Sequence, residues 1–269
     1  MTQAQIVTAP NRSKPLAIGS GALIGTLGGL IGLGGAEFRL PVLISLFHFA
    51  GLEAIILNKA ISLVVVATAL PFRASTVSFS ELGSHWPIIV NLLAGSLAGA
   101  WAGAEWATRL KTETLYRIIA VLLFVIAGVL LFAHDAGAGL PLFVGWAQIA
   151  TGVIAGFLIG VVASLLGVAG GEFLIPTLIL LFGADIKLAG SLSLAVSLPT
   201  MLVGFTRYSR DQSFSVLRKN WMFLLVMAAG SIVGTFVGGR LLGIVPNTIL
   251  LPLLAALLVL SAVKMWRHK

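Results

Sequence analysis

Glutamate and arginine side chains that follow glycine-rich stretches are the residues of this sequence best suited to chemistry. Glu37 and Arg39 follow one such stretch and Glu172 follows another, and the surrounding regions, 24–47 and 159–182, are copies at an offset of 135 residues with 12 of 24 positions identical. A carboxylate placed there can cap a helix that begins at the glycines. Inside a membrane, where ionisation is costly, it can instead carry a proton. The sequence leaves both roles open for Glu37 and Glu172.

The glycine-rich stretches predict breaks between apolar helices. A half-helix that begins at a break presents unpaired N–H groups and the positive end of its dipole, which favours a bound anion. We therefore expect backbone amides to bind an anionic substrate at Gly34, Gly35 and Ala36 in the first copy and at Gly170 and Gly171 in the second. The alternative is that glycine only permits a tight turn here.

Arg39 is a candidate for direct substrate binding. The second copy has Leu174 at the matching position, so the arginine belongs to one break alone. A guanidinium can hold an anion through paired N–H donors. Pairing with Glu37 and extension to a membrane interface are the other roles that the sequence allows.

Polar residues of the third apolar segment are further candidates for substrate binding. Asn58 and Lys59 lie near its start, and the matching region of the second half offers Ser191 and Ser193. Hydroxyl groups suit oxyanions, although serine in a helix often bonds its own backbone.

Composition places these residues in a polytopic membrane protein. Of the 269 residues, 58% are hydrophobic and 10% charged, with a mean hydropathy of +1.07, whereas a soluble domain carries roughly 25% charged residues. The net charge of +8 therefore reports membrane orientation rather than nucleic-acid binding. The absence of cysteine excludes disulfides, thiolate nucleophiles and cysteine-ligated metals.

Ten apolar segments, five in each half, predict an all-α architecture. They lie at 16–33, 38–50, 54–72, 86–104, 115–132, 141–167, 173–183, 187–206, 220–239 and 248–266. Because a span needs roughly 20 helical residues, 38–50 and 173–183 are predicted to be half-helices that fold back from each break. The expected domains are a tail (1–15), a first repeat (16–135) and a second repeat (136–269), with a shift of four residues in the third segment.

Basic residues favour a hairpin at each break. With a cytoplasmic N-terminus and hairpins that return to their starting side, 12 of the 17 basic residues lie inside, and only Arg73, Lys187 and Arg240 lie outside. Each half then crosses the membrane an odd number of times, which predicts inverted repeats and a cytoplasmic C-terminus. Glycines at every fourth position, such as Gly95, Gly99 and Gly103, predict close helix packing rather than ligand binding.

At the breaks the sequence resembles the sulfite exporter TauE/SafE family of bacterial membrane permeases. The motifs are Gly32-Leu-Gly-Gly-Ala-Glu-Phe-Arg-Leu-Pro41 and Gly167-Val-Ala-Gly-Gly-Glu-Phe-Leu-Ile-Pro176, and the resemblance spans residues 16–266. It implies movement of small sulfur-containing anions such as sulfite or organosulfonates, and in some members other organic anions, across the bacterial inner membrane. The two half-sites are not expected to be equivalent.

The expected function is a secondary transporter that exports a small sulfur-containing oxyanion, with one half rocking against the other. Protons are the expected coupling agent, and no cofactor, metal or nucleic acid is expected. The four histidines are scattered and neither a nucleophile elbow nor a Walker motif occurs, so an enzyme is not expected. An anion channel, a permease for carboxylates or other organic anions, uncoupled export and a non-transporting subunit remain alternatives.

Overall fold

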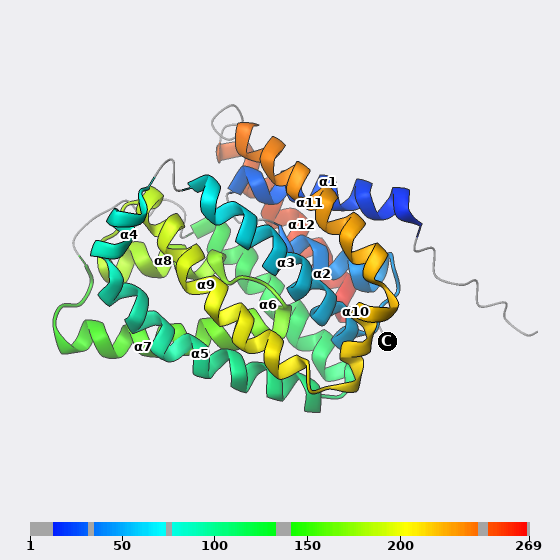
Figure 1. Cartoon of the computed structure of the whole chain (residues 1–269), viewed down its shortest axis with the longest axis horizontal. Coiled ribbons are helices and arrows are strands. Elements are labelled where there is room, and N and C mark those ends of the chain that lie inside the picture. Colours follow the sequence, from blue (N-terminus) through cyan, green and yellow to red (C-terminus); the bar gives the residue numbers. More distant parts are fainter. Residues whose placement is uncertain (1–12, 32–34, 74–76, 133–140, 242–246, 268–269) are drawn as a thin grey trace, which may run out of the picture.

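The computed structural model describes residues 13–31, 35–73, 77–132, 141–241 and 247–267, which are helical almost throughout (Figure 1). The α-helices are α1 (Lys14–Ile31), α2 (Ala36–Ser45), α3 (Gly51–Arg73), α4 (Phe79–Ser84), α5 (Trp86–Arg109), α6 (Thr112–Phe132), α7 (Trp146–Leu166), α8 (Gly171–Phe182), α9 (Ile186–Tyr208), α10 (Ser215–Lys219), α11 (Trp221–Leu241) and α12 (Asn247–Arg267). A 3-10 turn, Gln212–Phe214, precedes α10. These described residues include no strand, so the expected all-α class is confirmed.

Five helical stretches in the described part of the chain are long and apolar enough to cross a membrane. They are Gly51–Ala69, Trp86–Arg109, Trp146–Leu166, Leu188–Tyr208 and Trp221–Gly238. Tryptophans at helix ends are largely exposed, with Trp86 at 62%, Trp146 at 85% and Trp266 at 59%. Aromatic side chains at such positions are typical of membrane interfaces. The chain is a multi-pass membrane protein.

The two short helices after the glycine-rich breaks fold back on the helices before them. α2 has 10 residues and α8 has 12, or about 15 and 18 Å at 1.5 Å per residue, too short to cross. Gly35 precedes α2 with φ 71°, and a Cβ there would meet the carbonyl oxygen of Ile24 in α1. Gly170 precedes α8 with φ 81°, and its Cβ would lie 3.1 Å from the side chain of Ile159 in α7. The predicted half-helices are confirmed at both positions.

Glycine contacts bring α1 and α11 together as a closely packed parallel pair (Figure 1). A Cβ on Gly21 would meet the carbonyl oxygen of Met227, and one on Gly25 would meet that of Ser231. The contacts advance in the same direction along both helices, which shows that the helices are parallel.

The same arrangement joins α5 and α7. A Cβ on Gly156 would meet the carbonyl oxygen of Leu92, and one on Gly160 would meet that of Ser96. Gly156 and Gly160 lie 135 positions after Gly21 and Gly25 of α1, and Leu92 and Ser96 lie 135 positions before Met227 and Ser231 of α11. The α5–α7 contacts therefore repeat the α1–α11 contacts with the two halves exchanged. The stripes therefore pack helices, as the sequence predicts.

Contacts between other helices give their directions in the same way. α3 runs parallel to α11 and antiparallel to α9, whereas α9 runs parallel to α5. For α3 and α11 the contacts are Phe49, just before α3, with Phe223, and Ser62 near Ser231 through Arg39. For α3 and α9 they are Lys59 with Gly204, and the buried cluster that Val66 shares with Leu194 and Met201. For α5 and α9 they are Ser96 with Thr200 and Glu105 with Arg207. The equivalent helices α1 and α7 consequently run in opposite directions.

Helix boundaries keep the 135-residue offset closely. α3 and α9 span 51–73 and 186–208, α6 and α12 span 112–132 and 247–267, and α2 and α8 begin at 36 and 171. The predicted four-residue shift in the third segment is wrong for the helix boundaries. These features support the inverted repeat, although its boundary at 135–136 and residues 1–12 of the tail lie outside the described residues.

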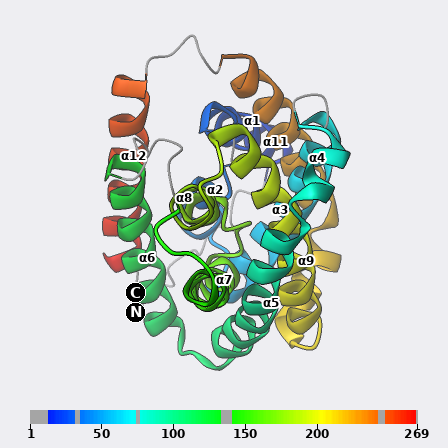
Figure 2. The same cartoon turned by 90° about the vertical axis from the view of Figure 1, so that its left-hand side faces the viewer.

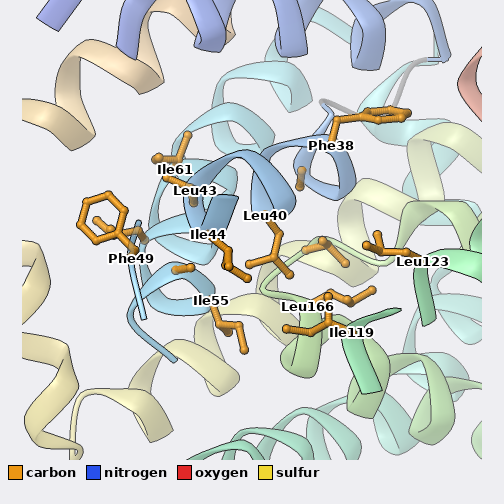
Figure 3. Packing of buried hydrophobic residues seen from close by; sticks show 14 of the residues in the cluster. Phe38, Leu40, Leu43, Ile44, Phe49, Ile55, Ile61, Ile119, Leu123 and Leu166 are labelled. Atoms are coloured by element: carbon orange, nitrogen blue, oxygen red, sulfur yellow. The ribbon is translucent and has the colours of Figure 1, made fainter. Parts of the chain in front are cut away.

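The half-helix α2 lies in the interior of the molecule, beside α3 (Figure 2), and also contacts α12 and α1. Leu40, Leu43 and Ile44 of α2 have no exposed surface, and Ile119 and Leu123 of α6 belong to the same cluster (Figure 3). Apolar packing of this helix on several sides fixes the position of the polar residues that it carries.

Candidate functional site

Arg39 lies in the middle of the molecule with no exposed surface. Its Nη1 donates to Asn58 Oδ1 at 3.2 Å and to Ser62 Oγ at 3.1 Å, and its Nη2 donates to Ser231 Oγ at 3.3 Å. The guanidinium thus connects α2, α3 and α11 through neutral oxygens. It does not extend to a membrane interface, and the described ion pairs do not include one with Glu37.

Asn58 connects the two breaks. Its Nδ2 donates to the carbonyl oxygen of Ala36, the first residue of α2, and to that of Leu166, the last residue of α7, both at 3.0 Å. Gly167 starts the second break with φ 67°, and a Cβ there would meet the carbonyl oxygen of Ile55 in α3. The Nδ2 atom of the fully buried Asn58 therefore hydrogen-bonds the edge of each break.

Lys59 is also fully buried and points toward α7 and α9. Its Nζ lies 3.1 Å from Ser164 Oγ and 5.6 Å from the ring centre of Tyr208. Gly204 makes room for the ammonium, because a Cβ there would lie 2.6 Å from Nζ. No carboxylate among the described residues forms an ion pair with this ammonium.

The glycines and Ala36 that were expected to bind substrate lie at the breaks, with Gly34 outside the described residues. Gly35 and Gly170 adopt left-handed conformations directly before α2 and α8. Ala36 and Gly171 are buried. The first residues of both half-helices are therefore shielded from solvent, and their local geometry fits the turn role as well as the anion role.

Glu37 is buried in the first turn of α2, with 3% of its surface exposed. Among the described residues, no hydrogen bond from a backbone amide to its carboxylate is present. Its position in the first turn still places negative charge at the positive end of the helix dipole. The side chain of Glu172 lies outside the described part of the structure.

Ser191 and Ser193 are both buried in α9. Ser193 Oγ donates to the carbonyl oxygen of Gly190 at 2.9 Å, inside its own helix. The α9 serine that reaches the second break is Ser197, whose Oγ donates to the carbonyl oxygen of Ala169 at 2.7 Å.

Sequence reasoning missed five polar residues that contact the site or its breaks. They are Ser62, Ser164, Ser197, Tyr208 and Ser231. A signal for one of them was present, because Ser231 belongs to an Ala-Gly-Ser sequence that recurs at Ser96. Small hydroxyl residues in otherwise apolar spans are the general signal for the others.

The arrangement places two cationic side chains among neutral oxygen acceptors. A hydrogen bond from a guanidinium or ammonium to an anion is stronger than one to a hydroxyl or amide oxygen, so an anion of suitable size competes well for these donors. Neither Arg39 nor Lys59 has accessible surface. Access to them therefore requires helices to move.

Comparisons with known proteins agree with a role in membrane transport. The family model described as "Sulfite exporter TauE/SafE" matches residues 17–265. The chain is also 23% identical over 241 residues to a curated Bacillus subtilis (strain 168) protein named "Probable membrane transporter protein YdhB", with 85% of this chain and 90% of that protein covered. No solved structure matches the chain.

Proposed function

Because this chain belongs to the sulfite exporter TauE/SafE family, we propose that it is a secondary transporter that exports a small sulfur-containing oxyanion, such as sulfite or an organosulfonate. The membrane is the bacterial inner membrane, with both termini in the cytoplasm. The family is one of membrane transporters. The sulfur-containing substrate and the outward direction of transport are what we propose for this chain.

The observation that carries the proposal is the pair of buried cations beside the joined breaks. Arg39 and Lys59 have no exposed surface, and Asn58, which precedes Lys59 in α3, accepts from Arg39 and bonds both breaks. Burying cations among neutral partners is costly unless they have a use. An oxyanion bound there would give the Lys59 ammonium a negative partner, and it could accept hydrogen bonds from the Arg39 guanidinium.

The proposed binding site combines these side chains with the break residues predicted from the sequence. Arg39, Asn58 and Lys59 contribute hydrogen-bond donors. The remaining proposed contributors are Gly34, Gly35, Ala36, Gly170, Gly171, Ser191 and Ser193, through backbone amides and hydroxyls. The side-chain cations belong to the first half, so the two half-sites bind the anion unequally.

Proton coupling through Glu37 or Glu172 is the second element of the proposal. The Glu37 carboxylate is buried in α2, two residues from Arg39, and the two charges interact. Uncoupled export is the competing mechanism, because a negative cell interior favours anion exit by about 2.3 kcal/mol per charge per 100 mV.

Flux measurements on purified protein in proteoliposomes test the proposal. A sulfite transporter should show saturable sulfite flux and should exchange labelled sulfite against unlabelled sulfite. Flux without saturation or exchange would indicate an anion channel, and preference for carboxylates would indicate another permease of the same fold. Protein that is inactive with every anion in a panel of sulfite, sulfonates and carboxylates would contradict the proposal.

A further inference from the structure

The helices around the site form two groups, each with helices from both halves of the sequence. The Arg39 group contains α1, α2, α3 and α11, joined by the glycine contacts of α1 with α11 and by the hydrogen bonds of Arg39. The Tyr208 group contains α5, α7, α8 and α9. Ser96 and Thr200 join α5 to α9 through hydroxyls 2.7 Å apart, and Gln148 joins α7 to α8.

Side-chain hydrogen bonds cross between the groups at two consecutive residues of α3. Asn58 donates to the carbonyl oxygen of Leu166, and Lys59 donates to Ser164. The other hydrogen bonds between described side chains of these eight helices and their breaks stay inside one group. The polar connection between the groups is therefore concentrated at one point.

The Tyr208 group offers Lys59 a preformed socket. Ser164 Oγ donates its own hydrogen to the carbonyl oxygen of Ala100 at 2.9 Å, so its lone pairs face the ammonium. Tyr208 turns its ring toward Nζ, and its hydroxyl donates to the Ser164 carbonyl oxygen at 2.9 Å. Together with Gly204, these residues place one ammonium against two helices of the opposite group, α7 and α9, and Ser164 in turn bonds the third, α5.

We propose that Lys59 is the releasable link between two moving helix groups, and that Ser164 and Tyr208 are the residues that position its ammonium when no anion is bound. An anion that enters between the groups is a stronger acceptor than the Ser164 hydroxyl. It draws Lys59 away from Ser164 and loosens the connection between the groups. The moving bodies are then the Arg39 group and the Tyr208 group, rather than the two sequence halves. This inference rests on the proposed transport function.

Cross-linking distinguishes these moving bodies, because the chain has no cysteine of its own. Ser96→Cys with Thr200→Cys joins the two sequence halves but stays inside the Tyr208 group. Val66→Cys in α3 with Leu194→Cys in α9 places two cysteines in one buried cluster, and a link between them joins the Arg39 group to the Tyr208 group. After disulfide cross-linking, the flux of an organosulfonate is measured, because sulfite itself cleaves disulfides. The first pair should keep this flux within about twofold, and the second should lose at least about tenfold until the link is reduced. Loss of flux in the first pair, or retained flux in the second, would overturn the inference.

The role of Lys59 has a readout that does not depend on flux. Spin labels at the exposed positions Gly19→Cys in α1 and Ala102→Cys in α5 report the distance between the groups. Sulfite should change this distance in otherwise unaltered protein and in a Lys264→Gln control, but not in Lys59→Gln or Ser164→Val. An unchanged response in Lys59→Gln would overturn the role of Lys59. Absent flux in unmodified protein would instead contradict the proposed function.

Discussion

Replacing Arg39 with alanine should weaken the affinity for the anion more than any other single change at the breaks. The guanidinium makes hydrogen bonds of 3.1–3.3 Å to Asn58, Ser62 and Ser231. A hydrogen bond that involves a charged group contributes about 1.5–3 kcal/mol, and about 1.4 kcal/mol changes an equilibrium constant tenfold. If bound substrate takes the place of one neutral acceptor, the loss of that bond raises the KM for sulfite about 10- to 100-fold.

The assay for Arg39 is initial sulfite flux against concentration in proteoliposomes, with thermal unfolding of the same preparation to exclude misfolded protein. Arg39→Lys keeps the charge but loses the planar fork that reaches α3 and α11 together, so its KM should lie between those of the wild type and Arg39→Ala. Arg240→Ala is the matched control, because this arginine is exposed and stacks on Phe236 at 4.8 Å. Folded Arg39→Ala protein with an unaltered KM would refute a role for this arginine in anion binding.

Three further predictions concern the helix packing, the breaks and the carboxylates. Gly25→Leu should destabilise the protein by about 1–3 kcal/mol or more through separation of α1 from α11, whereas Gly19→Leu should be tolerated because nothing lies within 4 Å of its Cβ; equal melting temperatures would contradict this. Gly167→Ala places a side chain in the left-handed conformation and its Cβ against the carbonyl oxygen of Ile55, so its cost in thermal unfolding should exceed the roughly 1–2 kcal/mol of that conformation alone; a smaller loss would contradict the close approach of α3 to the second break. If Glu37 or Glu172 carries the coupled proton, Glu37→Gln or Glu172→Gln should abolish the dependence of sulfite flux on an imposed pH gradient, whereas Glu53→Gln should not; unaltered dependence in both variants would leave helix capping as their role.

Apolar run length and motif repetition were enough to predict the long helices, the half-helices and the breaks, but not the short helices α4 and α10, which lie between apolar runs. Runs of 13 and 11 residues could not cross a membrane, and the structure has the short helices α2 and α8 there. The register of the third segment was not predictable from residue matching, because residues that face a common apolar environment substitute freely. The turns that begin α3 at Gly51 and α9 at Ile186 fix that register instead.

Individual site residues were predictable only where their chemistry is unusual for a membrane interior. Arg39, Asn58 and Lys59 stood out as polar residues in apolar segments, and the structure buries all three. Arg39 contacts Asn58, whereas Lys59 points toward α7 and α9. Ser164 gave no comparable signal, because a helix serine can satisfy itself on its own backbone, and the repeated Ala-Gly-Ser sequence of Ser231 did not indicate its partner. Their contacts span 105 and 192 positions in the sequence, so they depend on which helices pack together.

The offset of 135 residues allows the Arg39 site to be rebuilt in the second half. Leu174 occupies the position equivalent to Arg39, and it is buried with 1% of its surface exposed. The three acceptors of Arg39 also have oxygen-bearing equivalents, namely Ser193 for Asn58, Ser197 for Ser62 and Ser96 for Ser231. Ser193 now bonds its own helix, Ser197 bonds the carbonyl oxygen of Ala169 in the second break, and Ser96 bonds Thr200. The hydroxyls of all three can turn toward a guanidinium.

The double variant Arg39→Leu with Leu174→Arg moves the cation to this equivalent position. If the repeat is inverted and the anion lies between the two breaks, the relocated guanidinium faces the same anion from the opposite side. Sulfite flux should then recover at least in part relative to Arg39→Leu alone, and Ser96→Ala should abolish the recovery. Leu174→Arg in the wild-type background controls for the cost of a second buried cation. A folded double variant with no more flux than Arg39→Leu would show that the two breaks do not face one shared anion, because symmetry would otherwise make the two positions interchangeable.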